Sequence, residues 1–198
     1  MSDVGLGELA RCENLKVLKL NCCNEITGLG FQNFIGTGLK RLNLDMCEGI
    51  IDDSLALISQ IESLERLTLN RLKISDEGLQ YLGIMPNLKT LFERVIRGFF
   101  SFDSDMRITG DAFEHFNKSH LKTLSLLDIQ TLTEQGLKNI SCIENLQVLH
   151  LDTSSVTPHP KKRQKLTDEG LKDLEKLTHL RELSLNCCLT ISGTFLNT

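Results

Sequence analysis

The sequence predicts an α/β solenoid with parallel strands on its concave face and helices on its convex face. Two motifs that alternate along the 198 residues carry this prediction. The first is a hexad that occurs eight times: MSDVGL (1–6), ITGLGF (26–31), IIDDSL (50–55), ISDEGL (74–79), ITGDAF (108–113), LTEQGL (132–137), LTDEGL (166–171) and ISGTFL (191–196). The second, L-x-x-L-x-L or a close relative, begins at Leu15, Leu39, Leu64, Leu88, Leu121, Leu146 and Leu180. These starts lie 24, 25, 24, 33, 25 and 34 residues apart, and self-similarity at a nearly fixed period is typical of stacked repeats.

The L-x-x-L-x-L segments predict short strands, because their apolar residues alternate at the period of two that a half-buried strand shows. One strand–helix unit is too small to bury its own apolar face, so neighbouring units must bury it for one another. The leucines that we expect to point inward are Leu18, Leu20, Leu42, Leu44, Leu67, Leu69, Leu124, Leu126, Leu149, Leu151, Leu183 and Leu185.

Each hexad is predicted to begin a helix. Its Ser or Thr is a good N-cap, because the side-chain oxygen accepts a hydrogen bond from an otherwise unpaired backbone N–H. The acidic residues that follow, such as Asp76, Glu134 and Asp168, lie where the positive end of the helix dipole favours them. We interpret them as capping residues in preference to paired catalytic carboxylates. The fifth residue of the hexad is small in seven copies, which predicts a close approach of the helix to the neighbouring strand layer.

These motifs resemble the leucine-rich repeat family, and in particular its cysteine-containing subfamily. The residues that carry the resemblance are L-x-x-L-x-L, a cysteine three residues further on (Cys23, Cys47 and Cys188) and I-[ST]-D-x-G-L. Other repeats have Leu72, Ile96, Ile129 or Ser154 in place of the cysteine, so that part of the signature is partial. The resemblance implies a horseshoe-shaped solenoid. We expect a single domain over 1–198 with about seven repeats, with inserts near 94–107 and 152–165, as a segment of a longer protein.

Composition and motifs narrow the function. The net charge of −4 provides no general attraction to nucleic acid, and no apolar run approaches the roughly 20 residues that span a membrane. Seven cysteines follow the repeat and not a pattern of pairs, which favours an intracellular, cytoplasmic or nuclear location. Adjacent cysteines such as Cys22 and Cys23 do not have the spacing of zinc ligands. We therefore expect no enzyme activity, no catalytic residue, no cofactor, no metal, no small-molecule substrate and a monomeric protein.

The outward-facing strand positions and the two inserts form the predicted protein-binding surface. Three phenylalanines in the first insert either fold back onto the body or anchor a partner. Residues chosen as candidate contacts are Arg41, Asn43, Arg66, Thr68, Phe92, Arg94, Phe99, Phe100, Phe102, Ser125, His150 and Asp152.

Two basic features accompany this surface. A row just before the strands (Lys16, Lys40, Lys89, Lys122 and Arg181) is interpreted as a solvated edge, with contact to an acidic partner as the alternative. A run in the second insert has the composition of a nuclear-import signal, but we favour its interpretation as a solvated loop, because short basic runs are common by chance. That run consists of Lys161, Lys162, Arg163 and Lys165.

The resulting hypothesis is a non-enzymatic scaffold that binds a protein partner through its concave face and insert loops. F-box leucine-rich-repeat proteins, which are substrate receptors of ubiquitin ligases, use similar repeats, so a substrate-recognition module is one form of this hypothesis. The alternatives are a bacterial effector or adaptor that acts on host proteins, and a regulatory repeat domain attached to a catalytic domain outside this chain.

Overall fold

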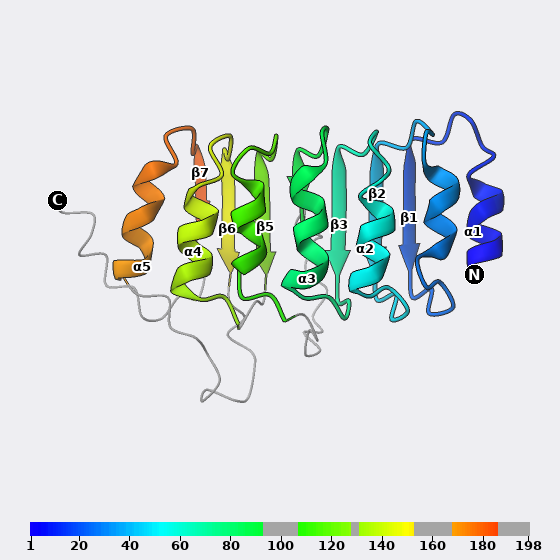
Figure 1. Cartoon of the computed structure of the whole chain (residues 1–198), viewed down its shortest axis with the longest axis horizontal. Coiled ribbons are helices and arrows are strands. Elements are labelled where there is room, and N and C mark those ends of the chain that lie inside the picture. Colours follow the sequence, from blue (N-terminus) through cyan, green and yellow to red (C-terminus); the bar gives the residue numbers. More distant parts are fainter. Residues whose placement is uncertain (93–106, 128–130, 153–167, 186–198) are drawn as a thin grey trace.

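The computed structural model describes residues 1–92, 107–127, 131–152 and 168–185. Strands and helices alternate through them as the two motifs predict (Figure 1). The strands are β1 (Val17–Asn21), β2 (Arg41–Asp45), β3 (Arg66–Asn70), β4 (Thr90–Leu91), β5 (Thr123–Leu127), β6 (Val148–Asp152) and β7 (Glu182–Ser184). The α-helices are α1 (Asp3–Leu9), α2 (Asp52–Ile58), α3 (Asp76–Leu79), α4 (Glu134–Ser141) and α5 (Asp168–Lys172), and the 3₁₀ helices are η1 (Leu29–Phe34), η2 (Gln80–Ile84), η3 (Asp111–Phe116) and η5 (Asp173–Lys176).

The strands form one parallel sheet in the order β1-β2-β3-β4-β5-β6-β7, and the helices cover one of its faces (Figure 1). Successive L-x-x-L-x-L motifs pair in register, for example Leu18 with Leu42 and Leu42 with Leu67. The predicted α/β solenoid is therefore confirmed. The face of the sheet that the helices do not cover, which the sequence predicts to be concave, is called the strand face.

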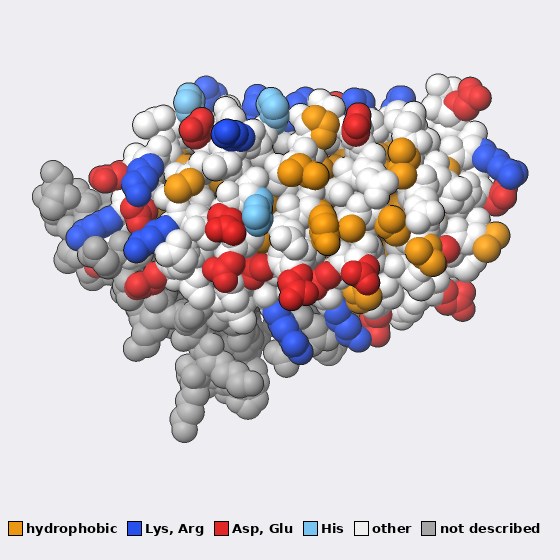
Figure 2. Space-filling view, viewed as in Figure 1, with side chains coloured by type: hydrophobic (Ala, Val, Ile, Leu, Met, Phe, Trp, Pro, Cys, Tyr) orange, Lys and Arg blue, Asp and Glu red, His pale blue; other side chains and the backbone are white. Residues whose placement is uncertain are grey.

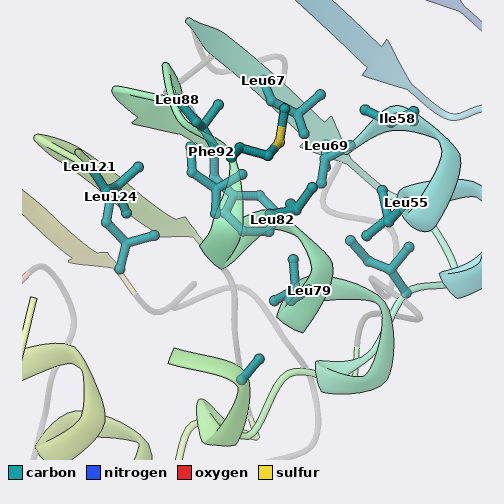
Figure 3. Packing of buried hydrophobic residues seen from close by; sticks show 14 of the residues in the cluster. Leu55, Ile58, Leu67, Leu69, Leu79, Leu82, Leu88, Phe92, Leu121 and Leu124 are labelled. Carbon is teal, nitrogen blue, oxygen red and sulfur yellow. The ribbon is translucent and has the colours of Figure 1, made fainter. Parts of the chain in front are cut away.

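The core lies between the sheet and the helices. Inward leucines of the strands, such as Leu67 and Leu124, are fully buried against helix residues such as Leu55 and Leu79 (Figure 3). Burying such a side chain contributes roughly 1.5–3 kcal/mol. Leu183 of β7 differs, because 42% of its surface is exposed although its register partner Leu149 is fully buried. The expected inward set is thus confirmed through β6 and is incomplete at β7.

Strand β4 is shorter than its neighbours. The backbone of Phe92 already adopts a left-handed conformation, with φ 55°, which in the first three repeats occurs at the residue after a five-residue strand, as at Arg71 with φ 51°. Its side chain enters the core and is only 5% exposed (Figure 3). The expectation that Phe92 faces outward is wrong. Because Glu93 stands where an inward leucine is expected, the early turn supplies an apolar side chain in its place.

The described hexads differ in how they start their helices, and four of them show two contrasting arrangements. Ser75 and Thr133 act as N-caps as expected, accepting hydrogen bonds from the N–H of Glu77 at 3.2 Å and of Gly136 at 2.8 Å. In the second and fifth hexads a glycine takes the N-cap position with positive φ, at Gly28 (100°) and Gly110 (97°), and a 3₁₀ helix follows. Thr27 and Thr109 are therefore not the N-caps of their own helices, which corrects the sequence prediction at these two positions.

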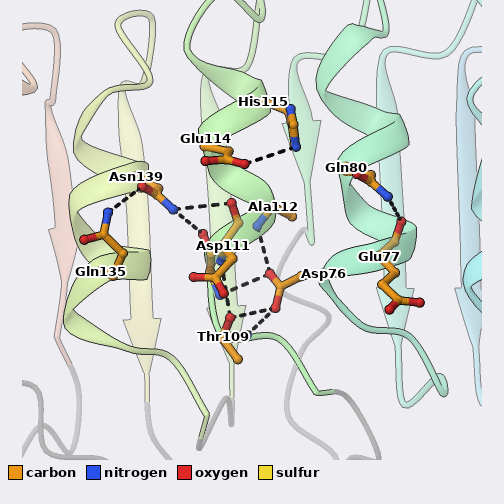
Figure 4. Close-up of polar contacts among 11 residues, drawn as sticks. Asp76, Glu77, Gln80, Thr109, Asp111, Ala112, Glu114, His115, Gln135 and Asn139 are labelled. Atoms are coloured by element: carbon orange, nitrogen blue, oxygen red, sulfur yellow. Dashed lines mark hydrogen bonds and ion pairs between the residues drawn. The ribbon is translucent and has the colours of Figure 1, made fainter.

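Acidic residues of the hexads reach across to the next repeat. Both carboxylate oxygens of Asp76 are used: Oδ2 accepts hydrogen bonds from the backbone N–H of Thr109 (2.7 Å) and from its Oγ1 (2.9 Å), and Oδ1 accepts them from Gly110 and Ala112 (both 3.1 Å) (Figure 4). Asp76 therefore does more than interact with the dipole of its own helix, as the sequence predicts, because its carboxylate also joins two neighbouring repeats. This supports the non-catalytic interpretation of these acids.

Asp52 and Asp3 repeat this contact. Asp52 accepts hydrogen bonds from the N–H and Oγ of Ser75, both at 2.7 Å. Asp3 accepts them from Thr27 and from the N–H of Gly30. Burial raises the pKa of Asp3, but the hydrogen bonds from the Thr27 side chain and from backbone N–H groups outweigh it, so the pKa lies below its ordinary value.

The small fifth residue of the hexad allows close packing between helical layers. A Cβ on Gly136 would lie 2.2 Å from the carbonyl oxygen of Thr109, and a Cβ on Gly78 would lie 2.4 Å from Oδ1 of Asp52. Both obstacles belong to the preceding hexad. The expected close approach is present, but its partner is the neighbouring hexad and not the strand layer.

Candidate functional site

The strand face holds most of the described candidate contacts. Arg41 is exposed, Asn43, Arg66 and His150 are partly buried, and all four project from the strands on the side away from the core leucines. This arrangement follows from the period of two, because residues between inward leucines must face the opposite side of the sheet. The outward placement of these four residues agrees with sequence analysis.

The centre of this face offers less surface than expected. Thr68 of β3, Thr90 of β4 and Ser125 of β5 point away from the core leucines, yet each is at least nine-tenths buried. Their hydroxyls are therefore not freely available to a partner. Exposed side chains of the strand face lie mainly on β1 and β2, and on β7.

The N-terminal part of the strand face forms a basic patch. We define the N-terminal patch as Lys16, Val17, Lys19, Asn21, Arg41 and Asn43. Lys19 pairs in register with Asn43, and Val17 with Arg41. Within the described residues, Lys16, Lys19 and Arg41 have no ion-pair partner. The period of two predicts that Lys19 and Asn21 face outward, but position alone does not indicate which outward residues remain unpaired, so neither is among the contacts predicted from the sequence.

Asn43 provides a second feature of this patch. Its side-chain oxygen Oδ1 is buried and has no hydrogen-bond partner. A buried acceptor without a donor costs about 1–3 kcal/mol relative to a satisfied one. The N-terminal patch thus combines three unpaired cations with one unsatisfied acceptor.

One acidic residue forms ion pairs with two lysines of the basic row at the start of the strands. Glu65 lies between two of its lysines, with Lys40 Nζ at 3.0 Å and Lys89 Nζ at 3.1 Å. These two side chains hold the pKa of Glu65 below its ordinary value. Lys40 and Lys89 therefore share one carboxylate, whereas Lys16 at the N-terminal end of the row has no ion-pair partner among the described residues.

Acidic side chains gather on part of the helix-covered face. Figure 2 shows many Asp and Glu side chains across its lower half, with Lys and Arg side chains along the upper edge, at the left and at the lower edge. The acidic region corresponds to the helix N-termini, where acids such as Asp53 and Glu77 are exposed. Favourable interaction with helix dipoles explains this acidic side without a ligand.

His150 joins three neighbouring strands near the other end of the strand face. Its Nδ1 lies 3.1 Å from Oγ of Ser125 on β5, and its Nε2 lies 2.9 Å from Oε1 of Glu182 on β7. The set combines a hydroxyl, an imidazole and a carboxylate, as hydrolases with a serine nucleophile do. Ser125 is only 2% exposed, however, so a substrate has no direct approach to its oxygen. We interpret the set as a fixed polar contact that orients His150 and Glu182.

The cysteines provide no separate site in the described residues. Cys47 is fully buried, and burial raises the pKa of its thiol, so it behaves as a small apolar residue. Cys22 is exposed and Cys23 is partly buried, and both are free thiols. In the described ranges no group of three or more His, Cys, Asp or Glu residues is placed to hold a metal ion. Among the same residues, no helix is long and apolar enough to cross a membrane.

Several candidate residues lie outside the described residues. These are Arg94, Phe99, Phe100 and Phe102 of the first insert, the basic run Lys161, Lys162, Arg163 and Lys165 of the second insert, and Cys188. The backbone of Asp152 is described as the end of β6, but its side chain is not. Their proposed roles stay predictions.

Comparison with solved structures supports a leucine-rich-repeat-like fold. The chain resembles a structure titled as a TLR13–ssRNA13 complex with a TM-score of 0.53 and 18% identity, over 96% of this chain and 30% of that one. It also resembles a chain of the Rad7–Elc1 complex of yeast (TM-score 0.48, 23% identity, 99% of this chain and 52% of that one) and the tropomodulin C-terminal domain of Caenorhabditis elegans (0.47, 13%, 90% and 93%). No protein-family model matches the chain. These likenesses concern the fold, and the site is argued from this chain's own residues.

Proposed function

We propose that this protein is a non-enzymatic scaffold that binds a protein partner through its strand face, together with its insert loops. The proposal rests on the alternation of buried and exposed residues along the first two strands. Alternate leucines are buried in the core, and Lys19, Asn21 and Arg41, which lie between or beside them, are exposed to solvent on adjacent strands. Side chains that packing does not use are the ones free to contact a partner.

Two observations favour binding over catalysis. The hydroxyl of the Ser125–His150–Glu182 set belongs to a buried residue, and the hexad carboxylates are engaged in hydrogen bonds between repeats. The exposed side chains of the N-terminal patch are instead three cations, the amide of Asn21 and the aliphatic Val17. Such groups suit a polar protein surface better than a small apolar ligand, which requires an enclosed apolar pocket.

A narrower form of the proposal is that the partner is a substrate of a ubiquitin ligase. Its support is the sequence pattern I-[ST]-D-x-G-L with the preceding strand motif, which resembles repeats of F-box leucine-rich-repeat proteins. Capture of ubiquitin-ligase subunits by the full-length gene product would support this form. Capture of partners without such subunits would leave the general scaffold and remove the ligase role.

Site-specific photo-cross-linking tests the general proposal. A benzophenone amino acid is placed at Asn21 on the strand face of the intact chain and, as a matched control, at Gln60, which is exposed beyond α2. The proposal predicts a discrete cross-linked protein from position 21 and none from position 60. Cross-linking from position 60 alone would show that the helix side carries recognition.

A further inference from the structure

We propose that the N-terminal patch binds an extended acidic segment of the protein partner. This inference rests on the proposed function and names the chemistry that the strand face recognises. Its first support is electrostatic. Lys16, Lys19 and Arg41 are exposed and without ion-pair partners in the described residues, whereas Lys40 and Lys89 of the adjoining basic row are both paired with Glu65.

The spacing of the cations fits a peptide in extended conformation. Arg41 is the register partner of Val17, and Lys19 lies two residues further along β1, so the two cations are diagonal neighbours on adjacent strands. Neighbouring strands lie about 4.8 Å apart and two residues of a parallel strand span about 6.6 Å, so diagonal neighbours of this kind lie about 8 Å apart. Side chains two residues apart in an extended peptide are separated by about 6.5–7 Å. Carboxylates at alternate positions of one segment can therefore pair with Lys19 and Arg41 together.

Lys16 extends the patch beyond the strand. Its ammonium group lies over the turn before β2, since a Cβ on Gly38 would be only 2.1 Å from Nζ. The side chain is thus directed from the first repeat toward the second, on the same edge as Arg41. A third carboxylate of the segment can be neutralised there.

The absence of aromatic side chains among the outward residues of β1 and β2 favours a peptide over a single-stranded nucleic acid. Single-stranded nucleic acid gains affinity by stacking its bases on aromatic rings. The outward residues of β1 and β2 are Val17, Lys19, Asn21, Arg41, Asn43 and Asp45, none of which is aromatic.

Fluorescence anisotropy with defined probes tests the inference on the intact chain. The probe is a labelled eight-residue peptide of alternating Glu and Thr, and the comparison probes are the same peptide with Gln for Glu and an eight-nucleotide oligouridine. We expect binding of the Glu peptide that weakens with added salt, and much weaker binding of both comparison probes. Binding of the Gln peptide or of the oligouridine as tight as that of the Glu peptide would overturn the inference.

Matched substitutions locate the binding. The double variant Lys19→Glu and Arg41→Glu should weaken Glu-peptide binding by at least about tenfold, since it converts attraction into repulsion. Lys118→Glu is the control, because Lys118 is exposed on the connection between η3 and β5, outside the patch, and should leave binding unchanged. Circular dichroism checks that all variants fold. Equal loss of binding in the control, or none in the double variant, would contradict the proposed location.

Binding of a protein partner and binding of an acidic segment are tested separately. If a partner cross-links from position 21 but the Glu peptide neither binds the chain nor competes with that partner, the strand face binds protein without an acidic segment. If the Glu peptide competes with the cross-linked partner, and the double variant loses both, the inference holds.

Discussion

Asp76 and Thr109 lie 33 residues apart in the chain, yet the Asp76 carboxylate accepts hydrogen bonds from both the N–H and the Oγ1 of Thr109, at 2.7 and 2.9 Å. Two further N–H groups, of Gly110 and Ala112, donate to the other carboxylate oxygen. This one side chain therefore joins the start of α3 to the next hexad, across the first insert. It connects these two repeats in addition to the pairing of the short strand β4.

Replacing Asp76 with Ala should lower the free energy of unfolding by about 1–3 kcal/mol, because backbone N–H groups in a partly buried place lose their acceptor. Urea denaturation followed by circular dichroism measures the change. Glu77→Ala is the control, since the side chain of Glu77 is exposed in the same turn, and a change within about 0.5 kcal/mol is expected. Equal losses in both variants would mean that the contact across the insert does not contribute to stability.

Replacing Phe92 with Ala should lower the free energy of unfolding by about 3–5 kcal/mol, because the ring is buried in the core and the smaller residue leaves a cavity. The same denaturation experiment measures it. If Phe92→Ala weakened partner binding and left the free energy of unfolding unchanged, the side chain of Phe92 would face outward, as the sequence predicts.

The third prediction contrasts two glycines at the same hexad position. Gly136→Ala should destabilise the protein by about 1–3 kcal/mol, since the new methyl group would overlap the carbonyl oxygen of Thr109. Gly170→Ala should be neutral or slightly stabilising, because its Cβ meets nothing closer than the Glu134 side chain at 3.4 Å and alanine favours the helix. Thermal unfolding of the two variants measures the difference. An equal loss of stability in both variants would show that the contact with Thr109 is not the cause.

The fourth prediction concerns acid pH. The pKa of Asp3 is lower in the folded protein than its ordinary value of 3.8, so its contribution to stability is complete above that value and is lost as the pH falls through the folded pKa. The difference in unfolding free energy between the wild type and Asp3→Asn should therefore be constant from about pH 5 to 8 and shrink below about pH 4. A difference that grows on acidification would contradict the assignment.

The repeat made the fold predictable from the sequence. A pattern that returns in register needs few tertiary details, and Leu42, Leu67 and Leu124 are buried as their alternation indicates. Phe92 was misplaced because alternation assumes an uninterrupted strand, although Glu93 at an inward position was a signal that the strand ends early. Leu183 could not be judged from the pattern, because burial near the last strand depends on which residues lie beyond it.

Side-chain contacts between repeats, within the helical layer and on the strand face, were less predictable than the fold. Asp3, Asp52 and Asp76 occupy the third hexad position, and each next hexad has Thr or Ser at its second position, namely Thr27, Ser75 and Thr109. Comparing successive hexads would have revealed this pairing, which examining each hexad alone concealed. The contact of His150 with Glu182 carries no such signal, since it depends on side-chain rotamers of residues 32 positions apart.

Hydroxyl-radical footprinting of the chain bound to the partner captured through position 21 tests the central claim most directly. Val17 on β1 reports on the strand face, whereas Leu29 on η1 and Ile84 on η2 report on the helix face, and all three are exposed in the free chain. The account predicts that the partner protects Val17 and leaves the oxidation of Leu29 and Ile84 unchanged. Protection of Leu29 and Ile84 with Val17 still reactive would contradict binding through the strand face.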